Sequence, residues 1–405
     1  MAINTNTTLT TASTTALNKT HYDRELLAFA RTKFIHAKYG QKRPIPRNGG
    51  KSVEFRRWNI FDPKLATSGL TEGVTPDGQA LSQTTVDATV NQYGAYVTIS
   101  DKLDMTALDQ VIDDSQELLG EQLGSVVEWV TRDIMNAGTN VQFAGANTSR
   151  IALESTDKLT VAEVRKAVRT LKKSKARMFN GTENGGASRA PHFLCICGPE
   201  ATYDLQDDTA WQYVSQYQNK EAIYSGEIGR LFGVVFVEST EAKTFEAGYV
   251  GKVKSFNGTT EAVTLEGILS KEAETYLKSA GAKINVDGAA YGITSVTRDP
   301  DADKSVVVLA STPTSDPEAG DTVFSCDAGA AGVTVYSSLV FGKDAYGIVD
   351  IGGNGGVQSI VKAFGSGGTE DPLNQRATVG AKVPAYTSVI LNQAWLVRIE
   401  HGATA

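Results

Sequence analysis

Three residues of types that can ligate zinc lie close together near the middle of the chain. Cys195 and Cys197 would share one face of a strand, and His192 is nearby. A structural zinc site needs four ligands, and the sequence offers no second cluster of such residues. We therefore interpret residues 193–197 as a buried strand whose cysteines pack as small apolar side chains.

A second pattern has the spacing of a calcium-binding loop. Asp299, Asp301 and Asp303 match its first three ligands, but Lys304 stands where the loop needs glycine and Ala310 where it needs glutamate. A polar turn between strands is the better interpretation, and a weak surface ion site is the alternative. The run GGNGG at residues 352–356 lacks the lysine and hydroxyl residue of a P-loop, which favours a tight connection over a phosphate site.

Nothing else in the sequence predicts catalysis. The four histidines are scattered, and no serine lies in a Gly-x-Ser-x-Gly turn. We expect no catalytic residues, no cofactor and no metal, so the chain is not predicted to be an enzyme. Its function should then rest on surfaces, and on the elements that carry them.

The composition bounds what those elements can be. The 405 residues are 41% hydrophobic and 21% charged, which is ordinary for two or three globular domains. The net charge of -7 excludes a polycation that coats nucleic acid. Three cysteines form no disulfide framework, which favours synthesis in a reducing cytosol. The polar start predicts no signal peptide, and no apolar run of about 18 residues predicts a membrane span.

The most informative elements lie between residues 39 and 137. A basic entry with proline and glycine at residues 40–50 leads to strands at residues 52–58, 84–90 and 91–99. A two-stranded ribbon is marginal in water by itself, so this one must lie on another surface. Residues 101–137 then predict one uninterrupted amphipathic helix, roughly 50 Å long at about 1.5 Å per residue.

The remaining elements alternate between helix and strand, which predicts a mixed α/β lobe followed by an inserted subdomain. Residues 376–399 read as long alternating strands that form a hairpin with a tight centre near Asn392. The other predicted elements are helices at residues 22–39, 160–177, 199–207 and 267–280, and strands at residues 193–197, 231–237, 291–296 and 305–309.

Opposite charges separate along this part of the chain. Residues 21–60 carry ten bases and three acids, a net of +7, whereas residues 101–137 carry nine acids and two bases, a net of -7. One interpretation is that both segments are solvated faces. The alternative is that a basic arm lies across the acidic helix of a neighbouring subunit. The candidate contact residues are Lys42, Arg43, Arg47, Arg56 and Arg57 from the arm and Asp109, Asp113, Asp114, Glu117 and Glu121 from the helix.

A second basic surface is predicted on the helix at residues 160–177. It carries seven bases against one acid, Glu163. A solvated face, contact with DNA phosphates and contact with a neighbouring subunit are all open interpretations. Since no sequence-reading motif is present, any DNA contact should be nonspecific and salt-dependent. The bases are Arg165, Lys166, Arg169, Lys172, Lys173, Lys175 and Arg177.

The order of these parts resembles the HK97-type coat protein of tailed phages. Several short sequence segments resemble one branch of that family, the N4-like major capsid proteins. The resemblance covers about residues 1–247 and 335–402. The segments that carry it are MAINT at 1–5, GQKRPIP at 40–46, GGK at 49–51, LTEGVTPDG at 70–78, QYGAYV at 92–97, LLGEQ at 118–122, RDIMNAGT at 132–139, LFGVV at 231–235 and DPLNQRATVG at 371–380.

The resemblance implies an α+β fold with a fixed set of domains. These are an N-terminal arm at 1–38, an extended β-hairpin E-loop at 39–100, a P domain with a spine helix at 101–154 and an A domain at 155–247. An inserted small α+β subdomain at 248–334 follows, and closing strands at 335–405 are shared by the P and A domains.

The function that the resemblance implies is self-assembly. The chain would form hexamers and pentamers of an icosahedral phage head around double-stranded DNA, with nonspecific DNA contacts. Portal, scaffolding and decoration proteins are further expected partners. The protein would be made in the host bacterial cytoplasm and reside in the virion, with no membrane contact. The alternatives are an encapsulin-like compartment shell of the same fold and a β-rich surface or adhesion protein.

Overall fold

The computed structural model describes residues 35–404, except for 60, 63, 65–71, 76–77, 107–110, 180–190, 210, 212–226, 280, 287, 300–303, 314, 352–355 and 367–370. The chain divides into two units. The first unit comprises residues 1–31, 95–121 and 359–381. The second comprises residues 32–94, 122–358 and 382–405. Of the helix predicted at residues 22–39, positions 22–34 lie outside the described residues, and His36–Lys38 form a turn.

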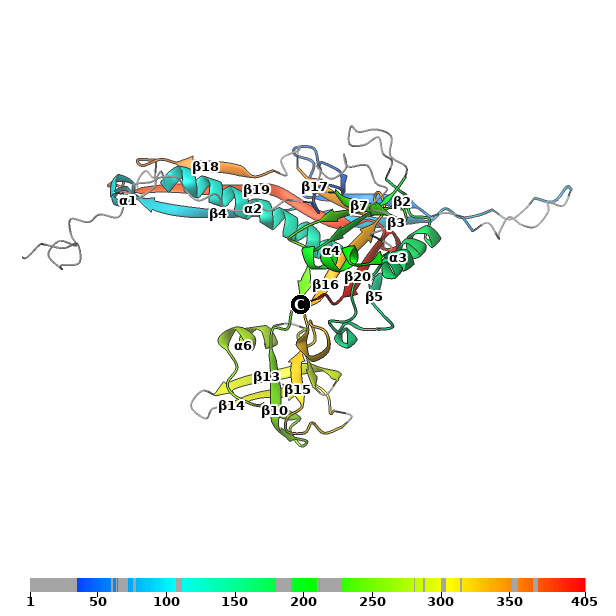
Figure 1. Cartoon of the computed structure of the whole chain (residues 1–405). Helices are drawn as coiled ribbons and strands as arrows, with labels where there is room; N and C mark the ends of the chain where they lie inside the picture. Colours follow the sequence, from blue (N-terminus) through cyan, green and yellow to red (C-terminus); the bar gives the residue numbers. More distant parts are fainter. Residues whose placement is uncertain are drawn as a thin grey trace, which may run out of the picture. The chain divides into compact units, whose positions relative to one another are not determined.

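The first unit contains parts of helices and strands whose remaining residues belong to the second unit. Strand β4 (Asn91–Ser100) leads directly into helix α1 (Asp101–Thr106), where the Ser100 hydroxyl accepts a hydrogen bond from the Leu103 N–H. Strands β4 and β18 (Gln358–Lys362) both pair with β19 (Arg376–Ile390). The helix predicted at residues 101–137 is described as α1 and α2 (Val111–Asn136), and the four residues between them lie outside the described residues (Figure 1).

The second unit contains a seven-stranded sheet that forms the predicted α/β lobe. Its order is β5-β20-β16-β6-β8-β7, and β9 also pairs with β16. The strands are β5 (Val141–Phe143), β6 (Phe193–Cys197), β7 (Glu227–Leu231), β8 (Val234–Glu238), β9 (Thr244–Phe245), β16 (Val335–Phe341) and β20 (Leu396–His401). The helices are α3 (Val161–Lys173) and α4 (Pro199–Gln206), and η3 (Arg150–Ala152) is a 3-10 turn.

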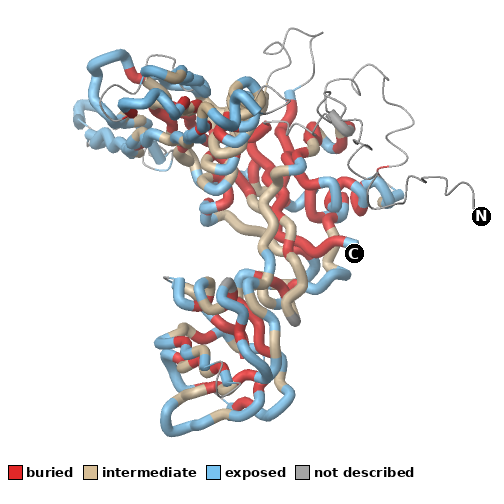
Figure 2. The backbone as a smooth tube through the Cα atoms, turned by 90° about the vertical axis from the view of Figure 1, so that its left-hand side faces the viewer, coloured by how far each residue is buried: buried red, intermediate tan, exposed pale blue. Residues whose placement is uncertain are grey.

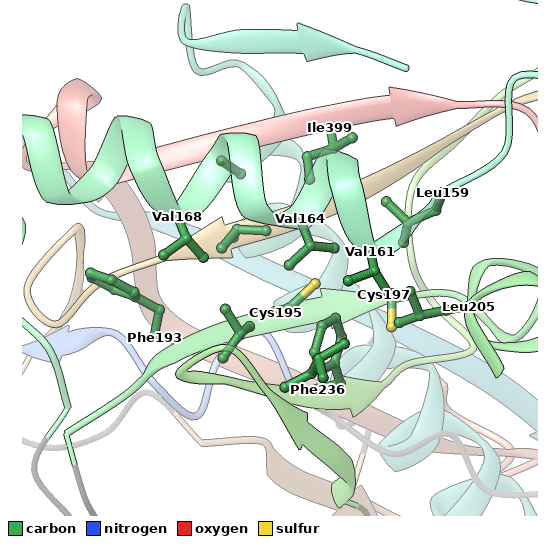
Figure 3. Close-up of a cluster of buried hydrophobic side chains, with 14 of the residues drawn as sticks. Leu159, Val161, Val164, Val168, Phe193, Cys195, Cys197, Leu205, Phe236 and Ile399 are labelled. Atoms are coloured by element: carbon green, nitrogen blue, oxygen red, sulfur yellow. The ribbon is translucent and has the colours of Figure 1, made fainter. Parts of the chain in front are cut away.

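Helix α3 lies on this sheet because its apolar residues recur on one side. Val164 and Val168 face Phe193 and Cys195 of β6, all four of them buried (Figure 3). Thr160 begins the helix, since its hydroxyl accepts a hydrogen bond from the backbone N–H of Glu163. This packing buries Phe193, Cys195 and Cys197 on one face of β6. All five residues of β6 are buried, as predicted for residues 193–197.

The single strand predicted at residues 231–237 is wrong. Strand β7 ends at Leu231, and β8 begins at Val234 and runs antiparallel to it. Phe232 and Gly233 lie between them with φ of 49° and 78°. Two successive positive φ values characterise a type I′ turn, which reverses a chain whose hydrophobic run is continuous in sequence.

The hairpin predicted at residues 376–399 is also wrong, because β19 and β20 do not pair with each other. In the second unit β19 pairs with β17 (Tyr346–Asp350), whereas β20 pairs with β16 and β5. The 3-10 turn η7 (Gln393–Trp395) separates them, and the Asn392 side chain accepts a hydrogen bond from the Ala394 N–H. Strand β16, which pairs with β20, is followed by β17, which pairs with β19. The two strand pairs therefore form one antiparallel ribbon that bends from one sheet into the other.

The ribbon predicted at the start of the chain is confirmed in its described part. Strand β2 (Ser52–Trp58) pairs antiparallel with β3 (Gln83–Thr89) along its whole length. Val53 and Phe55 pack with Val349 and Val389 at its base. The preceding β1 (Gln41–Lys42) pairs in parallel with β17, so this part of the entry segment belongs to a sheet.

Residues 250–325 of the second unit form a closed six-stranded barrel of order β10-β11-β14-β13-β12-β15. Its buried interior appears as red positions in the lower part of Figure 2. The helix predicted at residues 267–280 is shorter, because Gly267 has a positive φ of 76° and Ser270 caps the start of α6 (Lys271–Leu277). The strands are β10 (Val250–Asn257), β11 (Ala262–Leu265), β12 (Lys283–Val286), β13 (Ala289–Asp299), β14 (Lys304–Leu309) and β15 (Thr322–Ser325), and the 3-10 turn η5 (Ala330–Gly332) follows.

Candidate functional site

A hollow lined by arginines lies at the base of the β2–β3 ribbon. It has a volume of about 520 Å³. Arg56 and Arg57 reach it from β2, Arg43 from the segment after β1, and Arg177 from the segment after α3. Of the described residues, two carboxylates, Glu54 and Asp344, line it as well, and the other lining residues are uncharged: Gln41, Val53, Phe55, Thr84, Val86, Leu391, Asn392 and Trp395.

The two carboxylates neutralise two of the four guanidinium groups. Arg56 donates to Glu54 at 2.7 Å, and Arg177 Nη1 lies 3.7 Å from Asp344 Oδ2. The hydrogen bond from Arg56 to Glu54 and the charge of Glu54 raise the pKa of the Arg56 guanidinium. Arg43 and Arg57 make no ion pair with the described residues. The hollow can therefore accept further negative charge.

The structure brings some predicted contact residues together and leaves others apart. Arg43, Arg56 and Arg57 share the hollow, whereas Lys42 lies exposed in β1 and Arg47 lies exposed in the following turn. The predicted acids Asp113, Asp114, Glu117 and Glu121 lie on the part of α2 that belongs to the first unit, and Asp109 lies outside the described residues.

Sequence reasoning missed Arg177 and Asp344 as parts of this site. Arg177 was grouped with the basic helix at residues 160–177, but α3 ends at Lys173, and Lys175 takes a positive φ of 53°. The Arg177 carbonyl then accepts a hydrogen bond from Lys343 at 2.8 Å. Only this tertiary pairing brings Arg177 to β2, and no local pattern encodes it.

A buried carboxylate on α2 holds the segment that precedes β1. Glu128 Oε1 accepts hydrogen bonds from the backbone N–H groups of Ile35 and His36, both at 2.7 Å, and Oε2 accepts one from Ala37 at 3.2 Å. The His36 ring nitrogen Nδ1 lies 2.6 Å from Oε1. The Tyr346 hydroxyl donates to the His36 carbonyl at 2.5 Å. Both Glu128 and His36 are fully buried.

Opposing effects act on the Glu128 carboxyl. Burial by itself raises its pKa, but the hydrogen bond and charge of His36 and the N–H groups of His36 and Ile35 together outweigh burial. The pKa of Glu128 therefore lies below its ordinary value, and the group is a carboxylate at neutral pH. One feature of the sequence indicates this role, because Glu128 is an acid inside the apolar stripe of the predicted helix.

The candidate zinc and calcium patterns form no site among the described residues. Cys195 and Cys197 are fully buried in the core, and His192 stacks on Phe179 at 6.2 Å between ring centroids. A hydrogen bond with Cys197 and burial raise the pKa of the Cys195 thiol. Asp299 ends β13, while Asp301 and Asp303 lie outside the described residues. No group of three or more metal-ligating side chains occurs in the part of the chain that the structure describes.

Several large apolar side chains in the described part of the first unit are exposed. Met105 and Leu373 are exposed to 75% and 74%, and Tyr96 is exposed to 74%. Five further large apolar residues of this unit are exposed: Val97, Leu103, Leu118, Ile360 and Val361. None of the helices in the described ranges is long and apolar enough to cross a membrane.

The comparisons with known proteins identify a family. The model of a phage capsid protein family matches residues 130–364, which is more than half of the chain. The chain belongs to this phage capsid protein family. Membership implies a structural rather than an enzymatic role in a phage head. A comparison with curated protein sequences found no match.

Solved capsid structures are similar to this capsid protein along nearly its whole length. The capsid of cyanophage Pam1 has a TM-score of 0.57 at 13% identity and covers 99% of both chains. The capsid of cyanophage P-SCSP1u has a TM-score of 0.56 at 13% identity, covering 96% of this chain and 95% of that one. The capsid of Ralstonia phage GP4 has a TM-score of 0.57 at 11% identity and covers 96% of both. At these identities the likeness shows the fold, which is HK97-like with mixed α and β content.

Proposed function

We propose that this chain is a major capsid protein of a tailed phage, of the N4-like branch. It assembles into hexamers and pentamers of an icosahedral head that encloses double-stranded DNA. The observation that carries this proposal, beyond family membership, is the apolar surface of the first unit. Large exposed apolar patches mark interaction sites in soluble proteins. Eight large apolar side chains are exposed among the described residues of this unit, and we infer that a neighbouring subunit covers them.

The parts of the chain then take the roles that the HK97-type fold assigns. The β2–β3 ribbon is the base of the E-loop, α1 and α2 are the spine helix of the P domain, and the sheet with α3 and α4 is the A domain. Each subunit presents different patches head to tail, which closes rings of five or six. Many modest contacts then stabilise the shell together.

The arginine hollow is the proposed receptor for a neighbour's acidic residues. Arg43 and Arg57, the two guanidinium groups that its own carboxylates leave unpaired, supply the attraction. Lys42 and Arg47, which lie exposed in β1 and in the following turn, are further proposed contact residues outside the hollow. The proposed partners are Asp113, Asp114, Glu117 and Glu121 on α2 of the adjacent subunit, together with Asp109, which lies outside the described residues. Such complementarity sets register and encounter rate more than affinity.

Charge reversal at the hollow tests this contact. We expect Arg56→Glu combined with Arg57→Glu to give a folded subunit that forms at least roughly tenfold fewer shells at low salt, because like charges then oppose each other. Sedimentation of the assembly mixture measures the yield. The matched control is Arg56→Lys with Arg57→Lys, which keeps the charge and should retain most assembly.

Salt provides a second readout for the same contact. The advantage of wild type over the reversed variant should shrink as salt shortens the Debye length below about 10 Å. Wild-type yields from the reversed variant at low salt would refute the electrostatic role of these arginines. The capsid role itself would survive that result.

The barrel at residues 250–325 faces outward in this proposal, since an inward insertion would collide with packed DNA. It reinforces contacts between capsomers or replaces a separate decoration protein. Density for the barrel on the inner wall of a particle would contradict this. Nonspecific DNA contacts, portal and scaffolding partners, and synthesis in the bacterial cytoplasm complete the proposal.

A further inference from the structure

The exposed face of α3 forms an open groove in which all the charged lining residues that the structure describes are positive. Its volume is about 640 Å³, and it is lined by Arg165, Arg169, Lys172 and Lys173 together with Val168 and Phe232. Among the described residues, no carboxylate lines the groove and none of these four cations makes an ion pair. Lys166 differs, since it is held by Glu163 at 2.7 Å. The groove thus has four positive charges without a carboxylate partner in the described part of its own chain.

Phe232 adds an apolar contact to this groove at a structural cost. It occupies the first position of the type I′ turn with φ of 49°, where asparagine or glycine is preferred. Its side chain is 50% exposed, so core burial does not compensate for that strain. The Arg165 guanidinium lies 5.0 Å from the centre of the ring. A strained and exposed aromatic residue beside four cations indicates a binding surface.

The opposite end of the same sheet is acidic. Glu238 ends β8, Glu200 lies in the first turn of α4, and Glu246 follows β9. Thr244 of β9 lies opposite Tyr336 in the sheet, two residues before Glu246. Burial and then the charges of Glu200, Glu246 and Asp204 raise the pKa of Tyr336.

Most of the remaining charges at this acidic end are already engaged within the chain. Asp204 is paired with Lys158, Glu241 accepts from the Trp129 indole, and Asp133 pairs with both Arg132 and Lys243. Glu200, Glu238 and Glu246 make no ion pair with the described residues. These three carboxylates are therefore available to an external cation.

The two charged ends are separated along parallel strands. β6 and β8 run in the same direction, with Phe193 donating to the Gly233 carbonyl at the basic end and Cys197 opposite Glu238 at the acidic end. Five residues per strand place the ends roughly 15 Å apart. One lobe thus carries two different and complementary surfaces, which is what a head-to-tail contact between identical subunits requires.

We propose that the α3 groove binds the Glu200–Glu238–Glu246 end of a second copy of this chain. The contact joins neighbouring lobes within one ring, and it rests on the proposed capsid function. It is distinct from the arginine hollow at the ribbon base. The positive groove and its complement occur on the same chain, which favours a second copy over nucleic acid as the occupant.

A charge swap in the full chain tests this contact. Arg169→Glu with Lys172→Glu should reduce the yield of sedimenting shells at least roughly tenfold at low salt, and Glu200→Lys with Glu238→Lys should do the same. All four substitutions in one chain restore complementarity and should recover most of the wild-type yield. Near-UV circular dichroism of each unassembled variant checks that the subunit is folded.

A second variant keeps the test independent of charge reversal. Phe232→Asn relieves the strained turn and should leave the subunit folded while lowering the shell yield several-fold.

The assembly results decide between this contact and its alternatives. Wild-type assembly by the Arg169→Glu and Lys172→Glu variant overturns the proposal. So does a four-substitution chain that is folded but assembles no better than either double variant. Normal empty shells that lose only DNA retention would identify the groove as a nucleic-acid surface instead. A wild-type chain that never assembles would overturn the proposed capsid function, and this contact with it.

Discussion

At the residue scale, buried polar groups tie distant parts of the chain together. His401 is fully buried at the end of β20, where Nδ1 donates to the Gly402 carbonyl at 2.7 Å and Nε2 accepts from the Ser338 hydroxyl at 2.9 Å. Burial lowers the pKa of His401 to about 4, despite the opposing hydrogen bond to Gly402. The imidazole is therefore neutral in the folded state at pH 7.

This histidine makes the subunit acid-sensitive. The unfolded chain takes up a proton near pH 6.5, whereas the folded chain resists it until about pH 4, so stability falls as the pH drops between these values. His401→Gln should reduce the loss of unfolding free energy between pH 7 and pH 4 by about 3 kcal/mol. Urea unfolding of the unassembled variant and of wild type at both pH values measures this loss. Equal declines in both proteins would contradict the assignment.

Glu128 should control the order of the segment before β1. Glu128→Gln replaces one acceptor oxygen by an NH₂ group that faces the Ala37 N–H, which should cost about 2 kcal/mol locally at neutral pH. We expect roughly thirty-fold faster hydrogen exchange at Ile35, His36 and Ala37. Because the Glu128 pKa is depressed, this difference should be fully present above about pH 4.5 and should be lost as the pH falls through the lower pKa of the folded state.

A matched control for this residue lies on the same helix. Glu117→Gln changes an exposed carboxyl of α2 and should leave exchange at Ile35–Ala37 unchanged. Equal protection in both variants would show that Glu128 does not hold the segment.

The sequence predicted the apolar stripe of α2 through its spacing. It could not predict the role of Glu128, because the partners lie 91 to 93 residues away.

At the element scale, local patterns predicted strands and helices better than their pairing. The paired strands of the ribbon, β6 and α3 all follow from alternation, apolar runs or helical spacing. The turn at Phe232 and Gly233 was missed because a phenylalanine at positive φ breaks the usual turn chemistry. The pairing of β19 with β17 was missed because adjacent strands usually pair, and only tertiary packing overrides that tendency.

The barrel should fold without the rest of the chain. Its core residues, among them Val253, Ile284, Val307 and Val323, all come from within residues 250–325. Its first and last strands pair, since Val250 lies opposite Phe324, so its two chain connections are adjacent. An excised segment covering residues 246–328 should show dispersed amide signals and cooperative thermal unfolding. A disordered spectrum from this segment would contradict an independent barrel.

At the scale of the whole molecule, charge and apolar exposure both indicate contacts between subunits. The sequence predicted the opposite charges of residues 21–60 and 101–137, but it could not predict that Arg177 joins the basic residues of β2. The sequence also could not predict which apolar residues of the first unit are exposed. Leu118, for example, lies in the predicted apolar stripe and yet is 55% exposed. Exposure depends on which faces the fold leaves uncovered.

Electron microscopy of the full chain after expression in a bacterial cytoplasm tests the central claim most directly. The account predicts closed icosahedral shells in which rings of five and six subunits can be resolved. It also predicts density from each subunit's β2–β3 ribbon lying across the α2 helix of a neighbour. Persistent monomers under all assembly conditions, or open filaments without fivefold vertices, would contradict the account.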